Sequence, residues 1–340
     1  MTSIVDFIQP LLAGKDLDFE QAKGVLDVIF EGQVPEAQVA ALLTALRMKK
    51  VTASEIAGLA TSLRTHAVQV RTGIDDLVDT CGTGGGTVKT CNVSTGAALV
   101  AAGAGVTVAK HGNRGITSRC GSADVLEALG VKIDATADGV ARCIREAHIG
   151  FMFAPMFHPA MKFVQPIRKA LGFRTVFNIL GPLANPAGAT RQVLGVADEG
   201  LMETIVEALQ MLGTRHALVV HSDGLDEIST AGVTRLIELR DGRLATRLVS
   251  PKDLGMSLAR LEDLRVDTPQ ESAQVLRAIL EGRQMGPKRD ILALNAAAAI
   301  LVGGLAGSLK EGINAAEDSI RSGKALACLT KLIEVSKVEG

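Results

Sequence analysis

Apolar residues in the first seventy positions recur at the three- and four-residue spacing of helices, with no strand-like alternation. Two capping boxes, Asp18 with Gln21 and Thr52 with Glu55, mark helix starts. Such a box satisfies free amides at the beginning of a helix. The pattern predicts a small all-helical domain over residues 1–72.

The pattern changes near Asp75. The runs LVDTC and VTVAK read as strands, and each is followed by a glycine-rich turn and then by helical spacing. Strands that alternate with helices favour an α/β domain with a mostly parallel central sheet. Ligands of open α/β sheets bind beyond the carboxyl ends of the strands, where both glycine turns are expected.

The segment 158–188 interrupts this alternation. HPAMKFVQPIRKALG is predicted to be a helix kinked at Pro166, and NILGPLANPAG a loop that could form a hinge. Strands, a hairpin with a DG turn in RLIELRDGRLATRLV, and a mostly helical end from Thr268 follow. The expected fold is a small helical domain, joined by part of 158–188, plus a larger α/β domain over residues 73–340.

Charge and cysteine content narrow the function classes. The 36 basic and 37 acidic residues nearly cancel, which disfavours a nucleic-acid partner. The five cysteines form no CxxC pair, so we expect reduced thiols in a cytoplasmic protein. The early Asp6 and the lack of a basic leader disfavour a signal peptide. The longest apolar run, residues 291–307, contains Asn295 and three glycines, so it predicts an interior helix and not a membrane span.

The first glycine turn is the strongest candidate for anion binding. Gly82, Gly84, Gly85 and Gly86 follow the LVDTC strand and precede a helix. Main-chain amides in such a turn approach an anion closely because no side chain intervenes. Thr87 breaks the GxGxxG spacing, and no P-loop Lys-Ser or Lys-Thr follows. A dinucleotide or ordinary ATP site is therefore disfavoured.

Polar residues on two neighbouring elements extend this candidate site. Asn92, Ser94 and Thr95 open the next helix, where their oxygens can cap it, donate to phosphate or bind magnesium. Lys110 and Asn113 belong to the KHGNR turn, which read alone could equally be a solvated loop. Two such turns on one sheet edge suggest a ligand with two anionic ends.

Two further groups of residues could complete the site. Asp226 and Glu227 follow the strand HALVVHS; alone, such a pair is more often a solvated acidic loop. In a turn the two carboxylates can converge on magnesium, which needs only one or two carboxylates beside phosphate oxygens and water. His158 and Arg168 lie beside the proline-rich segment, and an arginine can clamp a carboxylate.

The ordered motifs resemble those of the anthranilate phosphoribosyltransferase family over nearly the whole chain. They are CGTGGG, NVST, KHGNR, GSADVLEALG, FAPMFHP, RKALGFRTVFNILGPLANP and GLDEIS. The resemblance implies a magnesium-dependent homodimer in tryptophan biosynthesis. It would transfer the phosphoribosyl group of phosphoribosyl pyrophosphate to the amine of anthranilate, giving N-(5-phosphoribosyl)anthranilate and pyrophosphate.

The resemblance also implies roles for individual residues. Phosphoribosyl pyrophosphate would contact Gly82, Gly84, Gly85, Thr87, Asn92, Ser94, Thr95, Lys110, Asn113 and Ser122. Anthranilate would contact Gly82, His111, Asn113, Pro155, His158 and Arg168. Magnesium would be held by Ser94, Asp226 and Glu227. No residue is assigned as a covalent nucleophile or a general base.

The chain departs from the family pattern at two places. Gly86 and Thr87 stand where the family commonly has Asp and Gly, and Cys91 replaces the usual aromatic residue. Two alternatives remain: a pyrimidine nucleoside phosphorylase of the same two-domain plan, and a non-enzymatic relative that binds nucleic acid. KHGNR and GLDEIS favour the transferase, and balanced charge disfavours the nucleic-acid binder.

Overall fold

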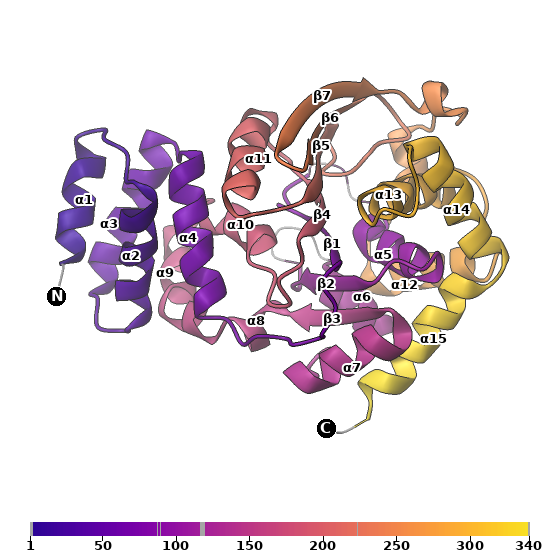
Figure 1. The fold of residues 1–340 in the computed structure, drawn as a ribbon, viewed down its shortest axis with the longest axis horizontal. Helices are drawn as coiled ribbons and strands as arrows, with labels where there is room; N and C mark the ends of the chain where they lie inside the picture. Colours follow the sequence, from indigo (N-terminus) through magenta and orange to yellow (C-terminus); the bar gives the residue numbers. More distant parts are fainter. Residues whose placement is uncertain (1–2, 87, 89, 116–119, 223, 339–340) are drawn as a thin grey trace.

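The computed structural model describes residues 3–86, 88, 90–115, 120–222 and 224–338. Its first part is a bundle of four helices, at the left of Figure 1. These helices are α1 (Ile4–Leu12), α2 (Phe19–Phe30), α3 (Glu36–Lys49) and α4 (Ala53–Thr65). Both predicted capping boxes are present, since Asp18 accepts from the Gln21 amide and Thr52 from the Glu55 amide. The helical first part is therefore confirmed.

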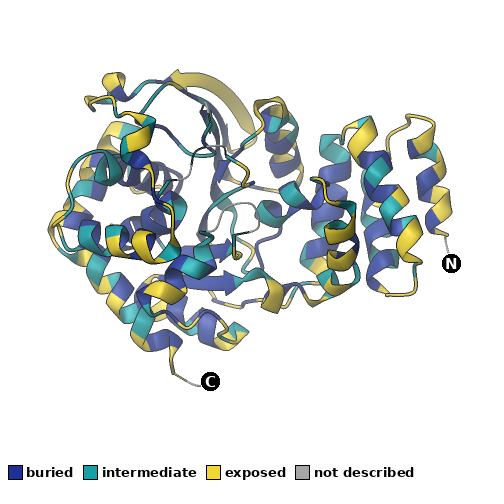
Figure 2. Ribbon diagram, turned by 180° about the vertical axis from the view of Figure 1, so that it is seen from behind, coloured by how far each residue is buried: buried dark blue, intermediate teal, exposed yellow. Residues whose placement is uncertain are grey.

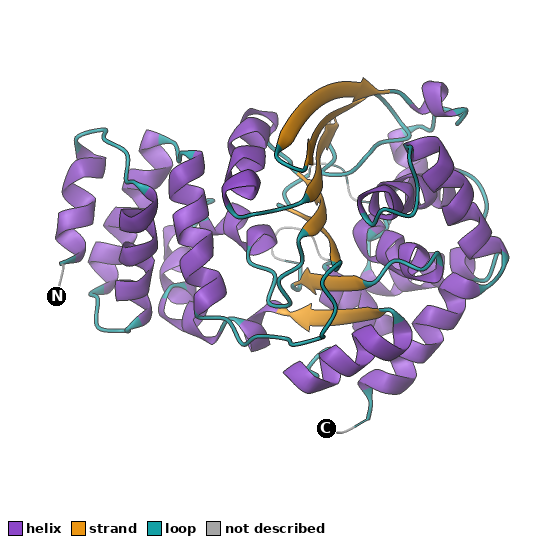
Figure 3. Ribbon diagram, in the orientation of Figure 1, coloured by secondary structure: helices purple, strands orange, loops and turns teal. Residues whose placement is uncertain are grey.

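A seven-stranded sheet forms the centre of the molecule, in the order β3-β2-β1-β4-β5-β6-β7 (Figure 3). The strands are β1 (Val78–Gly82), β2 (Val108–Gly112), β3 (Ile149–Phe153), β4 (Arg191–Gly195), β5 (His216–Ser222), β6 (Thr234–Arg240) and β7 (Arg243–Val249). The first five strands pair in parallel, whereas β6 and β7 pair in antiparallel fashion. The predicted α/β fold with a mostly parallel sheet is confirmed.

The hairpin at the end of the sheet follows from its two-residue DG turn. Asp241 and Gly242 both have positive φ, of 47° and 77°, as the tight turn between twisted strands requires. Strand β7 is the last strand of the sheet and so forms one of its edges. Its residues 243–248 are exposed, and Val249 is buried (Figure 2). The remaining edge is the short strand β3.

Helices cover both faces of the sheet because consecutive strand residues point to opposite sides. Val193, Leu218 and Val220 pack into a core with the helices at the right of Figure 1. Leu194 and Val219 pack into a second core that continues into the helical bundle. The helices after the bundle are α5 (Val93–Gly103), α6 (Ser122–Leu129), α7 (Ala137–Ala147), α8 (Ala154–Phe157), α9 (Gln165–Leu171), α10 (Phe177–Leu180), α11 (Met202–Met211), α12 (Pro269–Leu280), α13 (Pro287–Val302), α14 (Leu309–Arg321) and α15 (Lys324–Ser336). In the described part of the chain, no helix is long and apolar enough to cross a membrane.

The segment between β3 and β4 differs from the prediction in two ways. The expected single kinked helix is instead a short 3-10 helix, Pro159–Phe163, followed by α9. Pro166 is the second residue of α9, where its missing amide costs no hydrogen bond, so it begins a helix and does not bend one. The expected loop NILGPLANPAG begins inside α10. Ile167, Phe177 and their neighbours pack into the core of the helical bundle.

Candidate functional site at the carboxyl edge of the sheet

The motifs CGTGGG, KHGNR and GLDEIS lie at the same edge of the sheet, where β1, β2 and β5 end. Glycines at this edge allow the acidic loop after β5 to lie directly on neighbouring strands. A Cβ at Gly195 would lie 1.6 Å from the carbonyl oxygen of Asp226, and one at Gly82 would lie 2.4 Å from Asp226 Oδ2. The close approach brings Asp226 to the first glycine turn.

The first glycine turn is held open toward solvent by left-handed backbone. Gly84 and Gly85 have φ of 65° and 95°, and both are exposed. The Gly84 amide donates to Asp226 Oδ2 at 3.0 Å, and the Thr83 amide donates to the Gly195 carbonyl at 2.9 Å. Thr87, which the sequence placed among the donor-binding residues, lies outside the described residues.

The start of α5 has the predicted helix cap. Asn92 Oδ1 accepts the Thr95 amide at 3.2 Å, and the Asn92 amide donates to Ser272 Oγ. The side chain of Thr95 is buried, and its hydroxyl is without a hydrogen-bond partner among the described residues. Asn92 thus caps the helix while its side-chain amide group lies at the partly exposed edge.

Lys110 joins the two turns beneath the surface. Its Nζ donates to the Thr80 carbonyl at 2.5 Å and to Ser94 Oγ at 3.3 Å, and the residue is 1% exposed. Burial lowers the pKa of Lys110, and the nearby Asp79 opposes that effect. A cation at this depth would attract anionic groups without the mobility of a surface lysine.

Asp226 and Glu227 form a pair of neighbouring carboxylates that repel one another. Burial raises the pKa of both groups, and the charge of Asp226 raises the pKa of Glu227 further. The Ser94 amide donates to Glu227, while Lys110 opposes the increase in pKa. Both side chains remain partly exposed, so an ion can reach them.

This donor set suits magnesium. Within the described residues, no group of three or more His, Cys, Asp or Glu side chains could hold a metal ion. Two carboxylates and the Ser94 hydroxyl are too few for a complete protein cage. Magnesium commonly takes one or two carboxylates and completes its shell with phosphate oxygens and water. A divalent cation would also relieve the repulsion from Asp226 that raises the pKa of Glu227.

The second turn is anchored by a buried carboxylate that the sequence reading left unassigned. Asp79 is 0% exposed; its Oδ1 accepts the His111 amide at 3.1 Å and its Oδ2 accepts from Asn185 Nδ2 at 2.8 Å. Burial raises the pKa of Asp79 to about 6. An acidic residue inside the apolar run LVDTC is the sequence signal that could have identified it. Asn185 also donates to the Ala109 carbonyl, so it fastens the crossing segment to β2.

The outer part of the second turn is held by α6. Asp124 accepts the amides of Gly115 and Gly121, and it pairs with Arg114. Asn113 is exposed, and Ser122 is the first residue of α6. Their amide and hydroxyl groups therefore lie at the rim of the edge, as a role in substrate contact requires.

The predicted acceptor residues divide into a buried pair and an outer group. The rings of His111 and His158 lie 5.0 Å apart. Burial lowers their pKa values to about 3 and about 4, so both are neutral near pH 7. Nε2 of His111 has no hydrogen-bond partner within the described chain, whereas the main chain at Leu63 and Ala184 lies close enough to His158 to oppose the lowering of its pKa. Arg168 lies 5.5 Å from the centre of the Phe177 ring and donates to Gln165, and Pro155 is exposed.

A second residue missed by the sequence reading is Arg174, in the crossing segment after α9. Its Nη2 donates to the carbonyls of Thr83 and Gly84 at 3.1 and 3.0 Å. These contacts span about ninety positions of sequence, and nothing local distinguishes this arginine from its neighbours. The structure therefore supplies this contact independently of the motifs.

A cavity of about 460 Å³ lies at the opposite, amino-terminal edge of the parallel strands. Its lining includes Arg191, Arg215 and Arg240. Asp76 pairs with both Arg191 and Arg215, and Asp241 and Glu311 also line the cavity, so the positive charge is largely balanced. It shares no residue with the glycine turns or the acidic pair.

Comparisons with known proteins agree with this geometry. Residues 74–326 match the α/β domain of a glycosyl transferase family, and residues 5–67 match its helical bundle domain. An anthranilate phosphoribosyltransferase of Roseiflexus castenholzii is 51% identical over 337 residues, covering 98% of this chain and 99% of that protein. One of Chloroflexus aggregans is 50% identical, covering 99% of each.

Solved structures agree in the same way. The anthranilate phosphoribosyltransferase of Thermus thermophilus superposes with a TM-score of 0.93 at 41% identity, covering 97% of this chain and 99% of that one. The Saccharomyces cerevisiae enzyme, solved in complex with PRPP and Mg, gives 0.90 at 30% identity, covering 98% and 97%. The family resemblance inferred from the motifs is confirmed: the chain belongs to the anthranilate phosphoribosyltransferase family.

Proposed function

We propose that this protein transfers the phosphoribosyl group of phosphoribosyl pyrophosphate to the amine of anthranilate. The products are N-(5-phosphoribosyl)anthranilate and pyrophosphate, and the step belongs to tryptophan biosynthesis. The observation that carries the proposal is the continuous polar path between the two turns: Lys110 contacts Ser94, Ser94 contacts Glu227, and the neighbouring Asp226 contacts Gly84. One ligand with two anionic ends fits that path.

The donor is held by main-chain amides and by the cation beneath them. Gly84 and Gly85 present exposed left-handed backbone in the first turn, and Lys110 supplies charge between the turns. We assign donor contacts to the residues the motifs indicated: Gly82, Gly84, Gly85, Thr87, Asn92, Ser94, Thr95, Lys110, Asn113 and Ser122. Fixed donors around the leaving pyrophosphate stabilise the negative charge that develops as its bond to the ribose breaks.

Magnesium would be held by Ser94, Asp226 and Glu227, together with phosphate oxygens. When bound, the ion neutralises charge on the pyrophosphate. The Gly84 amide already fixes Asp226, so this carboxylate is oriented in advance. The yeast relative solved with PRPP and Mg supports this assignment.

Among the described residues assigned to the acceptor side, neither histidine is suited to deprotonate an amine. His111 and His158 have pKa values of about 3 and about 4, which makes them weak bases. Anthranilate's neutral aromatic amine can attack without prior proton loss, so orientation is the main requirement. Arg168 pairs with the carboxylate, and Gly82, His111, Asn113, Pro155 and His158 line the remaining surface. The yeast relative solved with 4-fluoroanthranilate supports an aromatic acid here.

The test is incubation with phosphoribosyl pyrophosphate, magnesium and a panel of acceptors. We expect pyrophosphate release together with loss of anthranilate fluorescence, and neither change without magnesium. Folded protein that consumes no anthranilate would contradict the proposal. Phosphate-dependent cleavage of thymidine or uridine in the same screen would identify a nucleoside phosphorylase instead.

The same proposal includes the quaternary structure, location and domain division expected from the family. The protein acts as a cytoplasmic homodimer, and its helical domain of residues 1–72 joins the α/β domain of residues 73–340. Cys81, Cys91, Cys143 and Cys328 form no disulfide, in keeping with a reducing compartment. Leu12 and Met48 are exposed apolar residues of the helical bundle that a second copy could cover. Light scattering after size-exclusion chromatography measures the mass; a monomer at all concentrations would contradict the dimer.

A further inference from the structure

The glycine turn that offers amides to an anion also has carbonyl oxygens that must point elsewhere. A carbonyl aimed into an anion site would repel the ligand. The carbonyls of Thr83 and Gly84 converge on one group, Nη2 of Arg174, at 3.1 and 3.0 Å. This terminal nitrogen carries two N–H groups, so it can donate to each of the two carbonyls.

The turn is shaped to receive this guanidinium. A Cβ at Gly85 would lie 2.1 Å from Arg174 Nη1 and 3.0 Å from Arg174 Cζ, so any larger residue would displace the arginine. The φ of 95° at Gly85 also disfavours a side chain. Glycine at this position therefore serves both the turn and its arginine partner.

Both sides of the turn are fixed by charged groups. Asp226 Oδ2 accepts the Gly84 amide, while Arg174 binds the Gly84 carbonyl. The positive charge of Arg174 is also close enough to act on Asp226. The backbone of Gly84 is thus held between an anionic and a cationic side chain.

Arg174 comes from the segment that packs on the helical bundle. It follows α9, which carries Arg168, and precedes Val176 and Phe177, which are buried in the core of that bundle. The backbone around Arg174 is therefore anchored in the core that the helical bundle shares with the sheet. Through this side chain the acceptor-side segment reaches the donor-side turn.

We propose that Arg174 is a positioning residue that holds the carbonyls of Thr83 and Gly84 away from the anion site, so that the amides of Gly85 and Gly86 face the pyrophosphate of the donor. This inference rests on the proposed function, because it takes the turn as the pyrophosphate site. The arginine acts through the turn and not through the acceptor. Its loss should weaken donor binding far more than acceptor binding.

The experiment compares Arg174→Met, which keeps the length of the stem, with Arg174→Lys, which keeps the charge. Arg277→Met is the matched control, because Arg277 also donates through Nη2 to a main-chain carbonyl, that of Leu129. Leu129 is the last residue of α6, at the opposite end of the helix from the turns. For Arg174→Met we expect the KM for phosphoribosyl pyrophosphate to rise about tenfold or more, the size of one charge-assisted hydrogen bond. The KM for anthranilate should change less than about twofold. Arg174→Lys should be intermediate, and Arg277→Met should match the wild type.

A second readout needs no turnover. Calorimetric titration with magnesium pyrophosphate should give a Kd about tenfold weaker for Arg174→Met than for the wild type or Arg277→Met. If Arg174→Met fails to fold by circular dichroism, Arg174→Lys decides by the same measurements. An unchanged donor KM and Kd, or equal increases in both KM values, would overturn the inference. An inactive wild type whose pyrophosphate Kd still depends on Arg174 would contradict the proposed transfer reaction and leave this role of Arg174 standing.

Discussion

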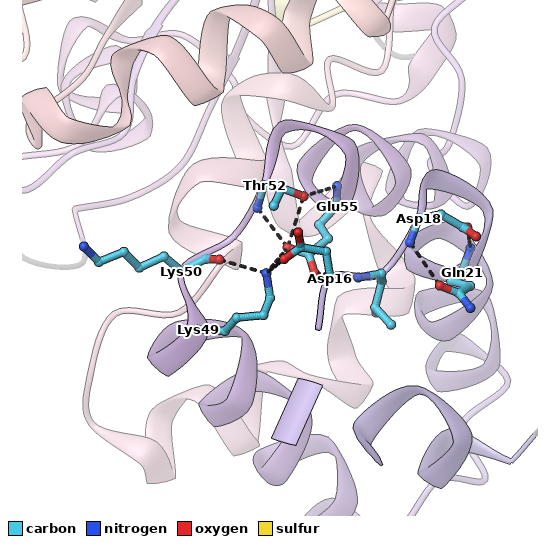
Figure 4. Close-up of polar contacts among 8 residues, drawn as sticks. Asp16, Asp18, Gln21, Lys49, Lys50, Thr52 and Glu55 are labelled. Atoms are coloured by element: carbon cyan, nitrogen blue, oxygen red, sulfur yellow. Dashed lines mark hydrogen bonds and ion pairs between the residues drawn. The ribbon is translucent and has the colours of Figure 1, made fainter. Parts of the chain in front are cut away.

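Two groups of acidic residues in this molecule meet opposite requirements. In the helical bundle, the fully buried Glu55 accepts hydrogen bonds from the amides of Leu17 and Thr52 and from Lys49 Nζ (Figure 4). At the sheet edge, Asp226 and Glu227 are neighbours of like charge, and burial with mutual repulsion raises the pKa of Glu227 well above its ordinary value. The first carboxylate has several donors, whereas the second pair shares few.

This difference distinguishes a structural acid from the pair that we propose to bind magnesium. Glu55 ties the end of α3 to the starts of α2 and α4, so its charge is used within the protein. Asp226 and Glu227 have oxygens left for an outside cation, at a cost in stability of the ligand-free protein. Four variants test the comparison, in order of decreasing expected effect.

The double variant Asp226→Asn/Glu227→Gln should have the largest effect. It removes the negative charge that holds magnesium while keeping the shape of both side chains. We expect kcat/KM to fall about a thousandfold, the size typical of losing an electrostatic stabiliser. Unfolding in urea should be unchanged or occur at higher urea, because the repulsion is gone. A loss of stability comparable with the loss of activity would mean that the pair is structural.

Glu55→Ala should give the reverse result. It leaves the Lys49 ammonium and the Leu17 amide without their buried partner. We expect the free energy of unfolding to fall by about 3 kcal/mol, as for a broken buried ion pair. The KM for both substrates should stay within about twofold of the wild type in the folded fraction. Urea denaturation followed by kinetics at low temperature measures both, and normal stability would refute the structural role.

Asp79→Asn tests an intermediate case, a buried carboxylate with partners that still has a raised pKa. The folded protein holds this proton more tightly, with a pKa of about 6 against 3.8, so the group favours folding most below about pH 4 and progressively less up to about pH 6. The variant cannot ionise. Its stability relative to the wild type should therefore rise across that window, measured by urea unfolding at several pH values. The variant removes the carboxylate oxygen that accepts from Asn185 Nδ2. This weakens the anchor of the second turn, so kcat/KM should fall about thirtyfold.

Arg168→Met should have the smallest effect. Since the residue is assigned to the acceptor carboxylate, the KM for anthranilate should rise about tenfold while the magnesium dependence stays unchanged. Steady-state kinetics with each substrate varied in turn provide the measurement. An increase confined to the KM for phosphoribosyl pyrophosphate would place Arg168 on the donor side.

Local chemistry made much of this structure predictable. The capping boxes at Asp18 and Thr52 and the DG turn act over a few residues, so their outcomes follow from the sequence. Pro166 was misassigned because a proline both kinks helices and starts them; packing against the helical bundle decides between the two. The edge location of the glycine turns also followed, because strand alternation fixes where parallel strands end.

The contacts that complete the site could not be predicted in this way. Asp79 meets Asn185 across 106 positions, and Arg174 reaches Thr83 across 91. No spacing rule connects residues so far apart, since the connection depends on how the crossing segment returns to the sheet. The family motifs indicated candidate substrate-binding residues but assigned no role to either anchor.

The route of the chain has a practical consequence for dissecting the molecule. After β3, the polypeptide enters the core of the helical bundle and then returns to form β4, so Ile167, Phe177 and Leu180 are buried in a core with helices that lie about a hundred or more residues earlier in the sequence. A fragment that begins near residue 72 would expose these apolar side chains, because the helices that cover them would be missing. The bundle made alone would likewise expose the apolar surface that the segment covers. We therefore expect neither fragment to fold alone. The two recombinant fragments should be soluble only when they are expressed together.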